Sequence, residues 1–173
     1  MSESPHHADP DRPSRLPTDV PQPETWLPPQ FAHPTRVDLT CGAHLRPIQG
    51  SDVEIDYPAV MGSRERLWKK YGQAWGWPPA TMTVDQDRKD LERHAREINA
   101  YMSFNYAVLD EDESRLPGCV YLDPPGADES TDVTVSWWVT DDHVGTPLEH
   151  ELEEFVPRWV TEAWPFSRPR FAP

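Results

Sequence analysis

The chain is short of positive charge. Its 173 residues include 30 Asp and Glu but only 16 Lys and Arg, which gives a formal net charge of −14 at pH 7. A surface of that sign repels phosphate backbones and anionic lipid, so we expect neither nucleic acids nor membranes as partners. The charge favours cationic small molecules and basic proteins instead.

Cysteine and long apolar runs are also scarce. Cys41 and Cys119 are the two cysteines, and they offer no disulfide framework, which favours a reducing compartment. The start of the chain lacks the charged and apolar regions of a signal peptide, and no apolar run approaches membrane-spanning length. We therefore expect a soluble, cytoplasmic protein, and the length suits a single domain.

Common catalytic motifs are missing as well. The sequence has no Gly-x-Ser-x-Gly elbow, no Walker loop, no Cys-x-x-Cys pair and no His-Glu-x-x-His helix. His143, His150 and Glu154 could be drawn as a metal cluster, but a surface ion pair between His150 and Glu154 explains their spacing better. No metal site is expected.

Proline is concentrated at the start of the chain. Nine of the 21 prolines fall within the first 34 residues, with few aliphatic residues between them. Such a segment buries too little apolar surface to offset the entropy lost on ordering. We predict a disordered proline-rich segment over 1–35 and a folded domain over 36–173, although Trp26-Leu27 and Phe31 could dock on the domain.

Apolar runs predict the strands of a sheet. Residues 104–109, 116–122 and 133–139 are separated by acidic or proline-containing turns, which indicates an antiparallel meander. The third run alternates apolar and polar side chains, as a sheet strand does. Gly118 marks a place where a neighbouring backbone comes close. Residues 37–49 read as a further small hairpin.

Helix signals lie on either side of the meander. Ser51 and Glu54 form a capping-box pattern that opens a helix or helix pair reaching Tyr71, with a break or kink near Pro58 and Gly62.

Two more helices follow along the chain. Thr83 and Gln86 repeat the capping box before an amphipathic stretch, and Thr146 and Pro147 open a helix after the meander. Residues 164–171 could supply a last edge strand.

This order of elements resembles the GNAT superfamily of N-acyltransferases. The residues that carry the resemblance are Leu45-Arg46-Pro47-Ile48 in the hairpin, two helices between Ser51 and Met102, Trp137-Trp138-Val139 at the end of the meander, and the helix after Gly145. The match covers about residues 36–171. It implies an α+β fold with a mixed, mainly antiparallel central sheet flanked by helices.

The resemblance also implies acetyl-CoA as co-substrate. In the superfamily, the splayed end of the fourth strand receives the pantetheine arm, and a turn at a helix N-terminus binds the pyrophosphate. The matching residues here are Trp138, Val139, Thr140, Gly145 and Thr146. The turn departs from the family pattern at Val144, Pro147 and Glu149, and a ligand-free helix cap explains the same residues.

Catalytic and acceptor residues follow from the same resemblance. The family's glutamate base matches the position of Thr134, with Asp132 as the nearest carboxylate on that face, and Tyr106 or Tyr121 could replace the family's tyrosine acid. Packing is the alternative role for both tyrosines. An aromatic cluster could form the wall of an amine pocket or simply pack in the core; its members are Trp68, Tyr71, Trp75 and Trp77.

Two functions remain open at this point. The first is an N-acyltransferase that passes an acetyl group directly from acetyl-CoA to an amine of a small molecule or a protein, without a covalent enzyme intermediate. The second is a non-catalytic GNAT-like domain that binds a small molecule or a basic protein partner. A homodimer is compatible with either.

Overall fold

The computed structural model describes residues 26–126 and 130–172. These residues form one six-stranded sheet whose strands lie in sequence order. The strands are β1 (Val37–Asp38), β2 (His44–Pro47), β3 (Phe104–Leu109), β4 (Gly118–Asp123), β5 (Val133–Val139) and β6 (Pro169–Ala172). The helices are η1 (Gly50–Asp52), α1 (Val53–Gly62), α2 (Arg64–Trp75), α3 (Val84–Asn99), η2 (Asp141–His143) and α4 (Pro147–Ala163). The disorder predicted for residues 1–25 falls outside this description.

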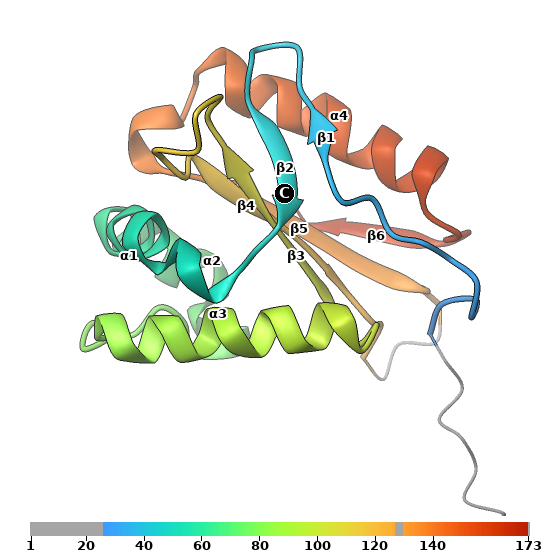
Figure 1. The fold of residues 1–173 in the computed structure, drawn as a ribbon, viewed down its shortest axis with the longest axis horizontal. Coiled ribbons are helices and arrows are strands. Elements are labelled where there is room, and N and C mark those ends of the chain that lie inside the picture. Colours follow the sequence, from blue (N-terminus) through green and yellow to red (C-terminus); the bar gives the residue numbers. More distant parts are fainter. Residues whose placement is uncertain (1–25, 127–129, 173) are drawn as a thin grey trace, which may run out of the picture.

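The sheet separates two layers of helices. Figure 1 shows α1, α2 and α3 on one side of the sheet and α4 on the other. Tyr121 of β4 meets Tyr71 of α2 at 5.9 Å between ring centroids, and Tyr106 of β3 meets Trp159 of α4 at 5.1 Å. Strands β1 to β5 pair antiparallel, whereas β5 and β6 run parallel. The predicted α+β class with a mainly antiparallel sheet is confirmed.

The central strands are covered on both faces. In β5, Trp137 belongs to the face that α4 covers, and Ser136 and Trp138 belong to the face of α1, α2 and α3; Ser136 lies opposite Tyr121. Residues of both faces are therefore buried, as the burial of all of β3 shows. Coverage on both faces explains why the sequence runs are nearly continuous in apolar residues. The predicted meander and final edge strand are both present.

The cap predicted for α3 is confirmed. The Gln86 N–H donates to Thr83 Oγ1 at 3.2 Å, and the Thr83 N–H donates to Gln86 Oε1 at 2.9 Å. Two donors at the helix start are thereby satisfied reciprocally. Leu91 and Ile98 form the buried side of the helix together with one charged residue, Asp87.

The cap predicted from Ser51 and Glu54 is wrong. Ser51 lies exposed within η1, and the capping box belongs to Gln49 and Asp52. The Gln49 N–H donates to Asp52 Oδ2 at 2.8 Å. Asp52 also pairs with Arg46 of β2, a partner that is not visible in the local sequence, and this pair holds the start of the helical region against the sheet.

The first helical region is also longer than predicted. The break occurs at Gly62 and Ser63, while Pro58 lies within α1. Helix α2 continues beyond Tyr71 to Trp75 and ends at Gly76, whose φ of 62° is in the left-handed region that favours glycine.

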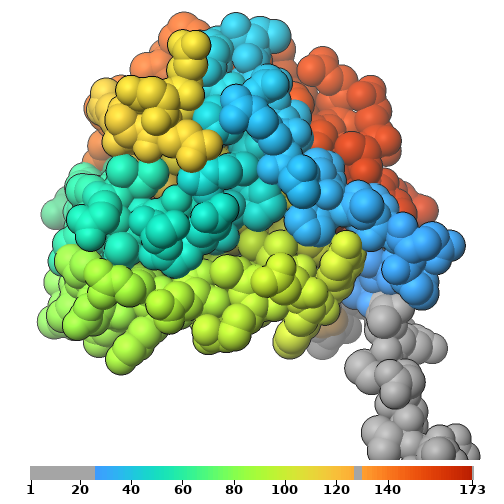
Figure 2. Space-filling model, viewed as in Figure 1, coloured from blue at the N-terminus to red at the C-terminus, as the bar shows by residue number. Residues whose placement is uncertain are grey.

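Residues 26–35 pack against the folded unit. The Trp26 Nε1–H donates to the carbonyl of Asp132 at 2.7 Å, Leu27 is buried, and Phe31 packs on Trp164 at 5.3 Å. Figure 2 shows this segment, in blue, along the surface between α3 in green and α4 in red. The expected docking of Trp26, Leu27 and Phe31 is thus confirmed.

Candidate functional site

A cavity of about 870 Å³ opens on the sheet face that carries the first three helices. Its floor includes Asn105 of β3 together with Tyr121 and Asp123 of β4, and α3 forms one wall. We call this cavity the sheet-face pocket. Its volume lies in the range of small-molecule sites.

Two of the four predicted aromatic residues line the sheet-face pocket, namely Trp75 and Trp77. Tyr71 is buried and stacks on Trp75 at 4.4 Å with an interplanar angle of 7°, so it supports the wall from behind. Trp68 lies outside the lining and is 41% exposed beneath the Arg64 guanidinium. The structure therefore brings Trp75, Trp77 and Tyr121 together and leaves Trp68 apart.

Asp123 is a pocket carboxyl with altered acidity. Burial, and then the nearby charge of Glu97, raise the pKa of Asp123 from 3.8 to about 6. A carboxyl with that pKa is ionised at neutral pH yet is a better proton acceptor than an exposed aspartate. Sequence reasoning missed this residue because Asp123 begins an Asp-Pro-Pro-Gly turn, where an acidic residue is ordinary.

A second acidic pair lies at the other end of α3. Asp56 of α1 and Asp87 of α3 are both buried and line the sheet-face pocket. Burial raises the pKa of Asp87 to about 6, and burial together with the charge of Asp87 raises the pKa of Asp56 well above its usual range. No pattern in the sequence links these two residues, which lie on different helices.

The residues predicted as catalytic occupy different places. Tyr121 is in the pocket floor, and its hydroxyl accepts a hydrogen bond from Trp138 Nε1 at 2.9 Å. Asp132 accepts the N–H groups of Ser167 at 2.7 Å and Arg168 at 2.9 Å, so it anchors the C-terminal segment.

Thr134 accepts from Arg170 Nη2 at 3.2 Å and, like Asp132, is outside the pocket lining. Its neighbour on β4 is Asp123. The pocket carboxyl therefore stands one strand away from the position that sequence reasoning selected for the base.

The residues predicted to bind acetyl-CoA lie at the end of β5 and at the start of α4. The carbonyl of Trp137 accepts from Lys70 Nζ at 2.7 Å, and the carbonyl of Val139 accepts from Arg66 Nη2. Paired β6 residues reach only as far as Ser136. Two long side chains of α2 therefore bind this end of β5, and burial, with the charge of Arg66, lowers the pKa of Lys70 to about 8.

The turn before α4 is capped from within the chain. Gly145 has a φ of 73°, and its N–H donates to Glu149 Oε2 at 2.6 Å. Thr146 occupies the N-cap position, but its Oγ1 donates to the His143 carbonyl at 2.6 Å and does not cap the helix. Pro147 stands in the first turn, as the ligand-free alternative predicted, but the capping box predicted from Thr146 and Glu149 does not form, because Glu149 accepts from the residue before the N-cap.

Acyl-CoA would fit the residues predicted to bind it after three internal contacts are released. The β5 carbonyls and the Gly145 amide are the kinds of group that hold a pantetheine arm and a phosphate. All three now bind the flexible side chains of Lys70, Arg66 and Glu149. Release of Lys70 and Arg66 would also leave two cations near this edge.

Other site types are not supported by the part of the chain that the structure describes. There, no group of three or more His, Cys, Asp or Glu side chains is placed to hold a metal ion. Within the same residues, no helix has the length and apolar character needed to cross a bilayer. Cys41 is exposed and Cys119 is buried, and neither forms a disulfide.

Several solved structures resemble this chain, whereas sequence comparisons give no match. Neither a protein-family model nor a curated protein sequence matches the chain. The ribosomal-protein-S5-alanine acetyltransferase of Vibrio fischeri superposes with a TM-score of 0.57 at 16% identity, covering 75% of this chain and 69% of that one. RimL, a ribosomal L7/L12 alpha-N-protein acetyltransferase in complex with coenzyme A, gives 0.57 at 13% identity, covering 72% and 67%.

A third similar structure belongs to a protein named for nucleotide-linked sugars. FdhC, described as a nucleotide-linked sugar GNAT, superposes with a TM-score of 0.52 at 14% identity, covering 78% of this chain and 72% of that one. At identities this low the similarity concerns the three-dimensional arrangement. The fold of this chain is that of the GNAT superfamily.

Proposed function

We propose that the protein is an N-acyltransferase that transfers an acetyl group from acetyl-CoA to an amine bound in the sheet-face pocket. One observation carries the proposal. Asp123, with a pKa raised to about 6, lies in that pocket directly opposite Thr134, where the GNAT resemblance puts the base. A basic carboxylate beside aromatic walls suits a cationic amine.

The pocket residues divide the work as follows. Asp123 accepts the proton that an ammonium must lose before its nitrogen can attack. Burial raises the pKa of Tyr121 well above its usual range, so its hydroxyl keeps its proton at neutral pH and can donate to the departing thiolate. Trp75 and Trp77 orient the acceptor and exclude water.

Direct transfer agrees with the state of the cysteine nearest the pocket floor. Cys119 lies two residues before Tyr121 on β4, and burial raises its thiol pKa well above the usual range. A protonated, buried thiol is a poor nucleophile. The acetyl group therefore passes straight to the amine.

Acetyl-CoA, when bound, supplies the acetyl thioester. Trp138, Val139 and Thr140 would hold its pantetheine arm, and Gly145 and Thr146 would hold its pyrophosphate. This requires that Glu149, Arg66 and Lys70 leave the backbone groups they now occupy.

The second candidate is a non-catalytic GNAT-like domain that binds a cation or a basic protein. The internal cap of Gly145 by Glu149 favours this function, because it satisfies the amide that a phosphate would need. An acidic pocket without a donor site would still bind amines. The two candidates therefore differ in whether acetyl-CoA binds.

Calorimetry with acetyl-CoA separates the candidates. We expect micromolar binding by the full chain and none by Gly145→Glu, which adds a charge at the turn. Failure of the unchanged protein to bind at millimolar acetyl-CoA would reject the transferase and leave the second candidate.

Amine acetylation followed against pH then tests the base. In the unchanged protein kcat/KM should rise with pH through about 6, the pKa of Asp123. Asp123→Asn should lower kcat/KM by about 100-fold and remove that limb. Asp132→Asn is the matched comparison, and a loss of the limb in this variant alone would move the role of base to Asp132.

A further inference from the structure

The sheet-face pocket has two acidic ends. At one end, Asp123 of β4 lies near Glu97 in the last turn of α3. At the other end, Asp56 of α1 lies near Asp87 in the first turn of α3. Ten helical residues from 87 to 97 span about 15 Å at about 1.5 Å per residue. The pocket therefore presents carboxyl groups at two separate places along one wall.

The two acidic ends are also separated along β4, which forms part of the pocket floor. The charges of Asp56 and Asp87 act on Cys119, whereas Asp123 is four residues further along β4. Four strand residues span about 13 Å at about 3.3 Å each. Tyr121 and its neighbour Asn105 lie between the two ends.

Two buried acceptor oxygens, one at the Asp56–Asp87 end of the pocket and one between the two ends, lack a hydrogen-bond partner in the described part of the chain. Asp87 is 2% exposed, and its Oδ2 has no hydrogen-bond partner among the described residues; Asn105 is 4% exposed, and its Oδ1 has none either. Both residues line the pocket. Buried acceptors are normally satisfied. A proton shared with Asp56 can satisfy the Asp87 carboxyl, and an ammonium group can replace that proton, whereas the Asn105 oxygen has no donor among the described residues. An ammonium group supplies three N–H donors.

Neighbouring cations do not neutralise the pocket. Five acidic and three basic side chains line it; the basic ones are Lys89, Arg93 and His94, and burial lowers the pKa of His94. Arg93 already pairs with Glu97 at 3.0 Å and with Asp90 at 3.4 Å. Lys89 is exposed at the rim. Asp52, which adds to the negative field at Asp56, is held by Arg46.

We propose that the acceptor is a small molecule with two amino groups, one held as an ammonium at Asp56 and Asp87 and the other presented to Asp123 at Tyr121. The proposal rests on the acceptor role assigned to this pocket above. An extended diamine bridges the two acidic ends, whereas a monoamine satisfies only one of them. The Asp56–Asp87 end is thus a specificity subsite that selects for the second charge.

Binding of α,ω-diaminoalkanes tests this subsite without acetyl-CoA. Calorimetry at pH 8 would compare a series of these diamines with 1-aminoalkanes of equal length. The unchanged protein should bind the best diamine about tenfold or more tightly than its monoamine partner, with an optimum chain length. Equal affinity for the two classes would overturn the proposal, and this comparison needs no variant.

Variants locate the preference. Asp87→Asn should reduce the diamine advantage to about twofold or less, because only the diamine needs both ends of the pocket. Glu153→Gln on the exposed side of α4 removes one charge elsewhere and should leave the advantage intact. If Asp87→Asn fails to fold, Asp56→Asn serves in its place. An advantage that survives loss of the subsite, or that falls equally in Glu153→Gln, would overturn the assignment to this end.

The two proposals fail separately. Diamine binding that depends on Asp87, without acetyl-CoA binding, would reject the transferase and keep the diamine as the ligand of the pocket. Acetylation that proceeds equally well on monoamines and diamines would keep the transferase and reject the subsite.

Discussion

At Gly118, the backbone of β4 lies very close to the backbone of β5. A Cβ at this position would lie 2.1 Å from the carbonyl oxygen of Trp138, which is rigid backbone in the middle of the sheet. The same Trp138 donates to Tyr121, so the spacing of these strands also sets the pocket floor. The glycine predicted from sequence as a point of close approach has that role.

Gly118→Ala should therefore destabilise the protein by about 2–3 kcal/mol, because the strands must separate to admit the methyl group. Urea unfolding measures the loss. Gly62→Ala is the matched control, since a Cβ there meets nothing within 4 Å, and it should cost little or nothing. Equal midpoints for Gly118→Ala and the unchanged protein would contradict the close approach.

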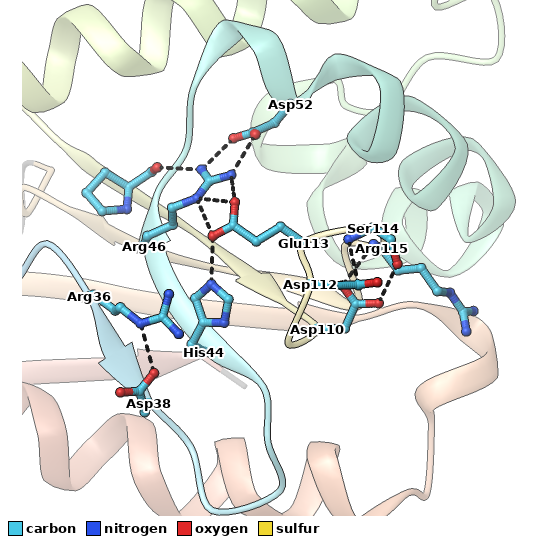
Figure 3. A network of polar contacts seen from close by, with 11 residues as sticks. Arg36, Asp38, His44, Arg46, Asp52, Asp110, Asp112, Glu113, Ser114 and Arg115 are labelled. Carbon is cyan, nitrogen blue, oxygen red and sulfur yellow. Dashed lines mark hydrogen bonds and ion pairs between the residues drawn. The ribbon is translucent and has the colours of Figure 1, made fainter.

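Among the elements, β2, η1 and the turn between β3 and β4 are joined by one polar network. Arg46 lies between Asp52, at 2.8 Å, and Glu113, also at 2.8 Å, and His44 Nε2 donates to Glu113 Oε1 at 2.8 Å (Figure 3). Glu113 holds a φ of 57°, uncommon for a residue with a side chain. These contacts offset the strain of that turn.

The network predicts a pH dependence of stability. Hydrogen bonds from Arg46 and then His44 lower the pKa of Glu113 from 4.5 to about 2. Because the folded-state pKa is the lower one, this stabilisation is complete above about pH 4.5 and is lost as the pH falls towards about 2. Urea unfolding across that window should show a smaller decline in Glu113→Gln than in the unchanged protein. Glu111→Gln, on the same exposed turn, should decline like the unchanged protein; identical curves for all three would refute the role of Glu113.

At the start of α4, one carboxylate competes with any anionic ligand. Glu149 Oε2 accepts from the Gly145 N–H at 2.6 Å. Its neighbour Glu151 turns away and accepts from the Thr40 hydroxyl at 2.8 Å and the Cys41 N–H at 2.9 Å in the β1–β2 turn. These two acidic residues of the helix therefore have separate structural partners.

Glu149→Gln should tighten acetyl-CoA binding by about tenfold, since it removes a charge and weakens the competing cap; this corresponds to about 1.4 kcal/mol. Calorimetry with acetyl-CoA measures the change. Glu153→Gln, one turn further along the exposed side, should change the affinity less than twofold. Weaker binding by Glu149→Gln would show that the carboxylate supports the donor site.

At the scale of the whole molecule, residues 26–35 close the edge of the α4 layer. Leu27 is 3% exposed, and Trp26 packs on Phe104 and Phe166 at 6.0 and 5.3 Å. The segment covers part of the core, and burial of its apolar side chains should stabilise the fold as burial of other core side chains does.

A chain that begins at residue 36 should therefore be less stable than one that begins at residue 26 by about 3 kcal/mol or more. Thermal unfolding of the two shortened chains measures the difference. Leu27→Ala in the full chain should reproduce most of it, and Arg36→Ala, an exposed residue, should not. Coincident unfolding curves for the two shortened chains would exclude this role.

Much of the fold could be predicted from sequence because its signals are local. Alternating and continuous apolar runs determined the three central strands, and the Thr83–Gln86 box determined the start of α3. The order of these elements determined the GNAT-like arrangement. The cap at Ser51 failed because a distant partner, Arg46, draws Asp52 into the capping position.

The candidate site depended on the tertiary structure. The sequence by itself determined that aromatic residues precede α3 and that the turn after β5 departs from the family pattern. Only the folded chain brought Asp56, Asp87 and Asp123 from α1, α3 and β4 into one pocket, removed Asp132 from it, and closed Gly145 with Glu149. The reason is physical: the pKa of a carboxyl and the partner of an amide depend on burial and on groups far away in the chain, which no local pattern records.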